Sequence, residues 1–218
     1  MNTPTQKIAL VTGLRGQDGY YLGIRLLAEG YRLVGTSHAG GCSVRLPLEG
    51  AEVDVAVEQL DLSSTSQVKD IIAKLRPDEV YNLAARSSSA QLFDDPLATA
   101  EVNGLAAARF MEAIRETSPQ TRFCQAASSE VFAGSRVSPQ DEDTPFRPVN
   151  AYGAAKAYAA NIVAAYRVRY GLFAATAILF NHESPQRGMD YVTRKITHTV
   201  ARIALRQAKE LTLGSLDD

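Results

Sequence analysis

The stretch Val11–Leu22, VTGLRGQDGYYL, decides the fold. It joins a short apolar run, residues 7–13, to the helical pattern of residues 20–30. Three glycines lie in this stretch with GxxGxxG spacing: Gly13, Gly16 and Gly19. Glycine at such positions allows a tight turn and lets a pyrophosphate approach the free N–H groups of a helix N-terminus. The stretch therefore predicts the first strand–turn–helix unit of a dinucleotide-binding domain.

Outside this stretch, short apolar runs alternate with longer helical patterns along the chain. Further strands are predicted within residues 31–37, 52–62, 78–85, 121–127 and 172–180, and helices within residues 63–77, 96–117 and 151–171. Such alternation predicts an α/β fold of the Rossmann type, a doubly wound parallel sheet with helices on both faces. After Asn181 a polar loop and a basic amphipathic helix replace this rhythm. We therefore expect a dinucleotide-binding domain over residues 1–180 and the start of a smaller, incomplete substrate domain over residues 181–218.

The bulk composition excludes several classes of function. The chain has 218 residues, 45% of them hydrophobic, and its 23 basic and 24 acidic residues nearly cancel. Without a basic stripe, a nucleic-acid partner is not expected. No apolar run approaches the ~20 residues of a membrane span, and the N-terminus lacks the apolar segment of a signal peptide. We expect a soluble, cytoplasmic protein with no membrane partner.

Neither the cysteines nor the histidines form a metal-binding pattern. Cys42 lies in a glycine-rich loop and Cys124 in an apolar run, where a buried thiol is expected. His182 and Glu183 are adjacent, but no third ligand follows at metal-binding spacing. We therefore expect no metal site and no disulfide.

The end of the second predicted strand indicates which dinucleotide is preferred. Sites for NAD usually place an acid there to hold the ribose 2′-hydroxyl, whereas residues 34–41 read VGTSHAGG. Arg15, Ser37 and His38 are placed to surround a 2′-phosphate, which favours NADP. NAD remains the alternative if Arg15 is only a solvated loop charge. The residues expected to contact the cofactor are Gly13, Arg15, Gly16, Gln17, Asp18, Gly19, Ser37, His38, Asp61, Leu62, Leu83, Ala84, Ala85, Tyr152 and Lys156.

Tyr152 and Lys156 lie four residues apart, about one turn on the same face of a predicted helix. A phenol with a pKa near ~10 is a poor base at neutral pH. A neighbouring ammonium favours the phenolate, and lowering the pKa by ~2–3 units requires ~3–4 kcal/mol. This spacing alone is a weak motif, because a surface tyrosine near a lysine is common. Its position after a strand with a polar end makes it more specific.

The polar strand end reads Ser128, Ser129 and Glu130. Serines and acids also start loops and cap helices. In an open parallel sheet, however, ligands bind beyond the carboxyl ends of the strands. Ser128 is placed to share a hydrogen bond with a substrate hydroxyl. Glu130 adds a second acid/base group, which a simple alcohol oxidation does not need.

These motifs resemble those of the extended short-chain dehydrogenase/reductases, and among them the GDP-mannose 4,6-dehydratase family. The resembling stretches run along almost the whole chain: VTGLRGQDGYYL, YNLAARS, EAIRE, QAASSEVF, DTPFRPVNAYGAAKAYA, ILFNHESPQRG and VTRKI. The last two are the most specific, whereas the Ser-x-Glu strand also suits UDP-glucuronate decarboxylases.

The resemblance implies an NADP-dependent dehydration of GDP-mannose by a homo-oligomer, a dimer or a tetramer. It implies Ser128, Glu130, Tyr152 and Lys156 as the catalytic residues. Tyr152 would take the proton of the sugar 4-hydroxyl and Glu130 the proton on C5. It also implies substrate contacts at Ser87, Ser128, Asn181, Val192 and Lys195.

The chain departs from the family pattern at several positions. Ser128 stands where the family usually has threonine, and His38 and Ala39 replace an arginine pair. Arg86, Ser88 and Ser89 alter a segment beside the expected sugar pocket, and relatives continue beyond the last residues of this chain. The alternatives are another nucleotide-sugar enzyme (a UDP-glucuronate decarboxylase, a 4-epimerase or a 4-reductase) or a non-catalytic NADP-binding protein without its substrate domain.

Overall fold

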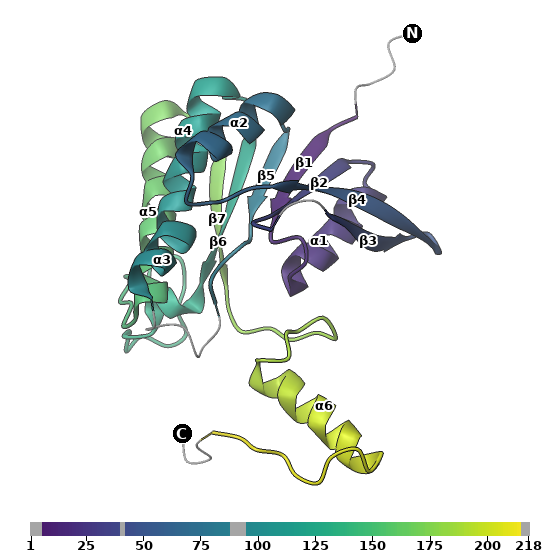
Figure 1. The fold of residues 1–218 in the computed structure, drawn as a ribbon. Coiled ribbons are helices and arrows are strands. Elements are labelled where there is room, and N and C mark those ends of the chain that lie inside the picture. Colours follow the sequence, from purple (N-terminus) through teal and green to yellow (C-terminus); the bar gives the residue numbers. More distant parts are fainter. Residues whose placement is uncertain (1–5, 40–41, 88–94, 215–218) are drawn as a thin grey trace. The chain divides into compact units, whose positions relative to one another are not determined.

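The computed structural model describes residues 6–39, 42–87 and 95–214 (Figure 1). Its sheet has seven strands in the order β3-β4-β2-β1-β5-β6-β7. The strands are β1 (Ile8–Thr12), β2 (Arg32–Ser37), β3 (Cys42–Leu48), β4 (Ala51–Gln59), β5 (Glu79–Asn82), β6 (Arg122–Ser128) and β7 (Ala174–Leu179). The chain winds outward from β1 in both directions, and the neighbouring strands are parallel except for β3 against β4. The predicted doubly wound α/β fold is confirmed.

The helices follow the predicted segments. They are α1 (Gln17–Ala28), α2 (Thr65–Leu75), α3 (Pro96–Ala100), α4 (Ala106–Thr117), α5 (Ala151–Tyr170) and α6 (Val192–Ala204), with the π-helical segment η2 (Glu101–Leu105) and the 3₁₀ turn η3 (Ser129–Phe132). Gly30 and Gly171 end α1 and α5 with positive φ angles of 81° and 66°. At α2 the Ser64 side chain accepts a hydrogen bond from the N–H of Gln67, so Ser64 is the N-cap.

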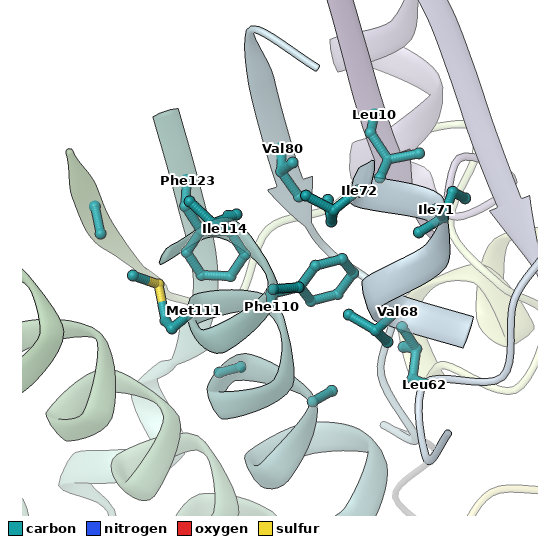
Figure 2. Close-up of a cluster of buried hydrophobic side chains, with 14 of the residues drawn as sticks. Leu10, Leu62, Val68, Ile71, Ile72, Val80, Phe110, Met111, Ile114 and Phe123 are labelled. Carbon is teal, nitrogen blue, oxygen red and sulfur yellow. The ribbon is translucent and has the colours of Figure 1, made fainter. Parts of the chain in front are cut away.

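Both faces of the sheet are buried. Successive side chains of a strand point to opposite faces, so each strand contributes to the core on both sides. On β1, Leu10 packs with residues of α2, α4 and α5, whereas Ala9 and Val11 pack with residues of α1. Phe110 of α4 lies at the centre of the first cluster, between β5 and β6 on one side and α2 on the other (Figure 2). Its ring centroid is 5.7 Å from that of Phe123. Helices therefore cover both faces of the sheet, so a binding site is expected at the ends of the strands.

Strand β3 corrects the expectation of a glycine-rich loop at Cys42. Residues 42–48 pair antiparallel with β4 at the edge of the sheet. The segment carries Arg45 and Pro47, which weaken a strand pattern in the sequence. An edge strand tolerates both, because one side of its backbone needs no partner strand. Leu46, fully buried against α1 and β2, supplies the hydrophobic anchor.

The chain divides into two compact units, residues 1–181 and residues 182–218. Within the described part of the second unit, α6 has no buried residue and has apolar side chains such as Val200 and Ile203 exposed. The assignment of this unit to substrate binding stays a prediction. Among the described helices, none is long and apolar enough to cross a membrane.

Candidate active site

The glycine turn lies between β1 and α1. Gly13 has a φ of 72°, and its carbonyl accepts a hydrogen bond of 2.9 Å from the N–H of Gly16. A Cβ on Gly19 would lie 2.3 Å from that same carbonyl oxygen, so only glycine lets the first turn of α1 pack this closely. The helix begins at Gln17, earlier than predicted, with Gly16 at the N-cap. Gly16 provides no side-chain cap to α1, and the N-terminus of a helix is a common binding position for an anion.

The end of β5 lies directly against this turn. A Cβ on Gly13 would lie 2.9 Å from the backbone nitrogen of Ala84. The Ala84 N–H donates to Oγ1 of Thr12 at 3.0 Å, which fixes the two strand ends together. The structure thus brings Leu83, Ala84 and the glycine turn together, as expected for residues that border one cofactor.

A buried chain of hydrogen bonds continues from the turn across the sheet. Thr12 Oγ1 donates to Oδ1 of Asn82 at 2.8 Å, and Asn82 Nδ2 donates to Oε1 of Gln125 at 2.8 Å. Gln125 Nε2 and Lys156 Nζ both donate to the carbonyl of Ala126, at 2.8 and 2.7 Å. The chain forms because Thr12, Asn82 and Gln125 lie in register on adjacent parallel strands. This chain of hydrogen bonds was not predicted from the sequence, although a polar residue near the end of each of three buried strands was a usable signal.

Lys156 is 1% exposed, and its burial lowers the pKa of the ammonium to about 8. Its Nζ lies 5.7 Å from the centroid of the half-buried Tyr152 ring. Lysine and tyrosine therefore face each other across one turn of α5, as the spacing predicts.

Replacing Lys156 with methionine is expected to remove a pH dependence of stability. The pKa in the folded protein, about 8, is below the value of 10.5 for an exposed lysine. The unfolded chain therefore holds the extra proton between these values, and the unfolding free energy of the wild type rises with pH in that window. Relative to Lys156→Met, this rise should amount to about 3 kcal/mol.

Denaturant titrations at pH 7, 8.5 and 10 test this expectation. The methionine variant leaves the Ala126 carbonyl bonded to Gln125 Nε2, so the comparison isolates the charge. Parallel pH profiles for the two proteins would contradict a lowered pKa of Lys156.

The polar strand end packs against the first turn of α5. Ser128 ends β6, and its Oγ accepts from the N–H of Glu130 at 3.3 Å. The Glu130 carboxylate accepts from Nδ2 of Asn150 at 2.7 Å, and Oδ1 of Asn150 caps α5 by accepting from the N–H of Gly153 at 2.7 Å. A Cβ on Gly153 would lie 2.5 Å from the Glu130 carbonyl oxygen. Ser128, Glu130 and the turn that carries Tyr152 are therefore brought together.

The π-helical segment η2 holds two parts of the site, a role that the sequence analysis did not predict. Asn103, 2% exposed, accepts from the N–H of Arg86 at 2.8 Å and donates to the carbonyl of Arg86 at 3.0 Å. A Cβ on Gly104 would lie 3.2 Å from the carbonyl of Ala155. The segment thus fixes the chain just before Ser87 and also packs against α5. A π-helical turn widens the helix locally and is frequent at functional sites.

Four of the residues expected to contact the cofactor lie at or just after the ends of β2 and β4: Ser37, His38, Asp61 and Leu62. Oγ of Ser37 accepts from the N–H of Ala39 at 3.3 Å. The Asp61 carboxylate accepts from the hydroxyl and the N–H of Ser63, which lowers the pKa of Asp61, and nearby His38 adds to the shift. The side chain of Leu62 is packed in the core, so a contact with the cofactor there would involve its backbone.

The expected substrate residues are divided between the two units. Asn181 is the last residue of the first unit and is exposed, whereas Val192 and Lys195 are exposed on α6 of the second. Ser88 and Ser89 lie outside the described residues. Within the described ranges, no group of three His, Cys, Asp or Glu side chains could hold a metal ion.

Known proteins resemble this chain over nearly its full length. The family model described as GDP-mannose 4,6 dehydratase matches residues 10–218. A GDP-mannose 4,6-dehydratase of Vibrio cholerae is 41% identical over 221 residues, which cover 97% of this chain and 59% of the relative. The GDP-mannose 4,6 dehydratase of Cricetulus griseus is 41% identical over 222 residues, which cover 97% and 60%. This chain thus spans about three fifths of the length of these relatives.

A solved structure agrees on the fold. The UDP-glucose 4-epimerase of Thermus thermophilus superposes with a TM-score of 0.75 at 23% identity, over 91% of this chain and 63% of that one. At this identity the likeness shows the fold alone. Sheet order, glycine turn and the Tyr-x-x-x-Lys helix define the class, the extended short-chain dehydrogenase/reductases. Within this class, the chain belongs to the GDP-mannose 4,6-dehydratase family.

Proposed function

We propose that the protein catalyses the NADP-dependent dehydration of GDP-mannose to GDP-4-keto-6-deoxymannose. One observation carries the proposal. The Ser128–Glu130 end of β6 packs on the turn of α5 that bears Tyr152, and the glycine turn likewise follows the carboxyl-terminal end of a strand of the same parallel sheet, β1. An oxidation followed by an elimination requires two acid/base groups beside one sugar. Tyr152 supplies a phenol and Glu130 supplies a carboxylate. The relatives named as GDP-mannose 4,6-dehydratases support the choice of substrate.

A nicotinamide dinucleotide fits the glycine turn. Gly19 lets α1 begin directly against the glycine turn, which sets the helix N-terminus where a pyrophosphate would lie. When bound, the cofactor supplies the hydride acceptor for C4 and the hydride donor for C6. Arg15, Ser37 and His38 support NADP as the dinucleotide, since the end of β2 carries no acid.

The residues of the chain divide the proton transfers between them. Tyr152 takes the proton of the 4-hydroxyl, helped by the Lys156 ammonium, while Ser128 holds that hydroxyl. The new ketone acidifies the proton on C5, which Glu130 removes as water leaves from C6. Asn181, Val192 and Lys195 bind the GDP group, and Ser87 contacts the sugar. A dimer or tetramer is the expected assembly.

The direct test is turnover by the protein expressed from its complete reading frame. With GDP-mannose and NADP, mass spectrometry should show a product that has lost one water and carries a 4-ketone, with no net NADPH. Release of carbon dioxide from UDP-glucuronate, epimer formation, or reduction of a 4-keto sugar would each replace the proposal with one of the alternatives. No turnover of any of these substrates would favour a non-catalytic NADP-binding protein.

Replacing Gly19 with alanine tests the cofactor part of the proposal. The added methyl group would meet the backbone at Gly13 and Leu14, neither of which can move without opening the turn. Overpacking of this kind costs about 1–3 kcal/mol, so NADP binding measured by calorimetry should weaken about 5- to 150-fold.

Gly30→Ala serves as the matched control at the other end of α1. Its methyl group would meet nothing within 4 Å, although its φ of 81° strains an alanine. This control should lose about 1–2 kcal/mol of stability and keep its NADP affinity. Equal affinities for the Gly19→Ala variant and the wild type would place the cofactor elsewhere.

A further inference from the structure

Asn150 joins two parts of the site through opposite ends of its side-chain amide. Oδ1 accepts from the N–H of Gly153 at 2.7 Å, and Nδ2 donates to Oε2 of Glu130 at 2.7 Å. The amide can take only this orientation, because a backbone N–H is always a donor and a carboxylate is always an acceptor. The side chain is half-buried, and the backbone at Asn150 is extended, with φ −138° and ψ 167°.

Backbone hydrogen bonds hold Asn150 next to Glu130. After η3 the chain leaves the sheet and returns through residues 134–150. Two backbone bonds tie the ends of this segment together, from Gly134 N–H to the carbonyl of Arg147 at 2.8 Å and from Arg147 N–H to the carbonyl of Val131 at 2.7 Å. Gly153 then packs on the Glu130 carbonyl. Asn150 therefore lies beside Glu130 because of the fold and not because a flexible loop happens to reach it.

We propose that Asn150 is a positioning residue that holds the Glu130 carboxylate for removal of the C5 proton. This inference rests on the proposed function. With Oε2 bonded to Asn150, Oε1 remains to act on the sugar. Oε1 takes the C5 proton, the electron pair of the C5–H bond moves into the C5–C6 bond, and the C6 oxygen leaves as water with that proton returned to it. The same amide caps α5, the helix that carries Tyr152. The Glu130 carboxylate is therefore held in a fixed position relative to Tyr152.

Asn150→Asp is the sharpest variant for the test. Aspartate keeps an oxygen to cap α5 but replaces the N–H donor by an oxygen that repels Glu130. Asn150→Ser also keeps a capping oxygen but cannot span to the carboxylate, so it removes the bond without adding repulsion. Ser64→Ala is the control for a general loss of helix stability, since it removes the side-chain cap of α2, and it should dehydrate GDP-mannose at the wild-type rate.

Both Asn150 variants, made in the protein expressed from its complete reading frame, should dehydrate GDP-mannose about 10- to 100-fold more slowly. KM and the single-turnover rate of C4 oxidation should stay close to those of the wild type. In a Glu130→Gln background, Asn150→Asp should add little further loss, because the two residues act as a unit. Unchanged turnover, equal slowing of C4 oxidation, or full additivity with Glu130→Gln would overturn the proposal.

A separate measurement distinguishes failure of this inference from failure of the proposed function. If the wild-type protein does not dehydrate GDP-mannose, the proposed function is wrong. The Asn150–Glu130 link would then be judged by a double-mutant cycle in unfolding free energy. Glu130→Ala is used in this cycle because alanine leaves no oxygen to accept from Asn150 Nδ2. Coupling between Asn150→Ser and Glu130→Ala that exceeds the error would support the positioning role, and additive effects would overturn it.

Discussion

Replacing Tyr152 with phenylalanine is expected to lower dehydration of GDP-mannose by about 10²- to 10⁴-fold, the usual contribution of a general acid or base. The change removes the phenolic oxygen that we propose takes the proton of the 4-hydroxyl. It keeps the ring, which lies 5.7 Å from Lys156 Nζ, so the packing of α5 should be preserved. In the proposed reaction C4 oxidation precedes elimination, so both steps should fall together. The absorbance of NADPH in a single turnover measures the first step.

Tyr158→Phe is the matched control for this variant. Tyr158 lies on the same helix, is 42% exposed, and loses the same single atom. It should retain wild-type turnover. If the two phenylalanine variants were equally active, the proton of the 4-hydroxyl would have to go to another group, and the proposed role of Tyr152 would be wrong.

Replacing Glu130 with glutamine is expected to separate oxidation from elimination. Glutamine keeps an oxygen to accept from Asn150 Nδ2 and so should preserve the turn η3, but its amide is not a base at neutral pH. C4 oxidation should continue, whereas elimination should fall by about 10²- to 10⁴-fold. In D₂O, deuterium should no longer enter C5, and NADPH should accumulate.

Glu142→Gln, an exposed substitution in the segment between η3 and α5, is the control for loss of one negative charge. It should show normal turnover and normal exchange at C5. Wild-type dehydration by Glu130→Gln would exclude this carboxylate as the C5 base, and another group would have to remove the C5 proton.

The sequence by itself determined the elements that short-range patterns encode. The glycine spacing at the start of α1, the alternation of strands and helices, and the glycines that end α1 and α5 all follow from local backbone needs, and the structure confirms them. The four-residue spacing of Tyr152 and Lys156 likewise places both on one face of α5. The roles of these residues stay predictions until the variants are measured.

Only the tertiary structure decided which distant residues meet. Thr12 and Asn82 are 70 residues apart, yet strand register places them in one buried hydrogen-bond chain. Edge position made a strand of residues 42–48, where Pro47 argues against one in the sequence. In the sequence, Asn150 has the pattern of an ordinary helix cap. Only the packing of the turn η3 brings the carboxylate of Glu130, 20 residues away, to the side-chain Nδ2 of Asn150. Local periodicity carries no information on such contacts, because they form only when separate elements pack.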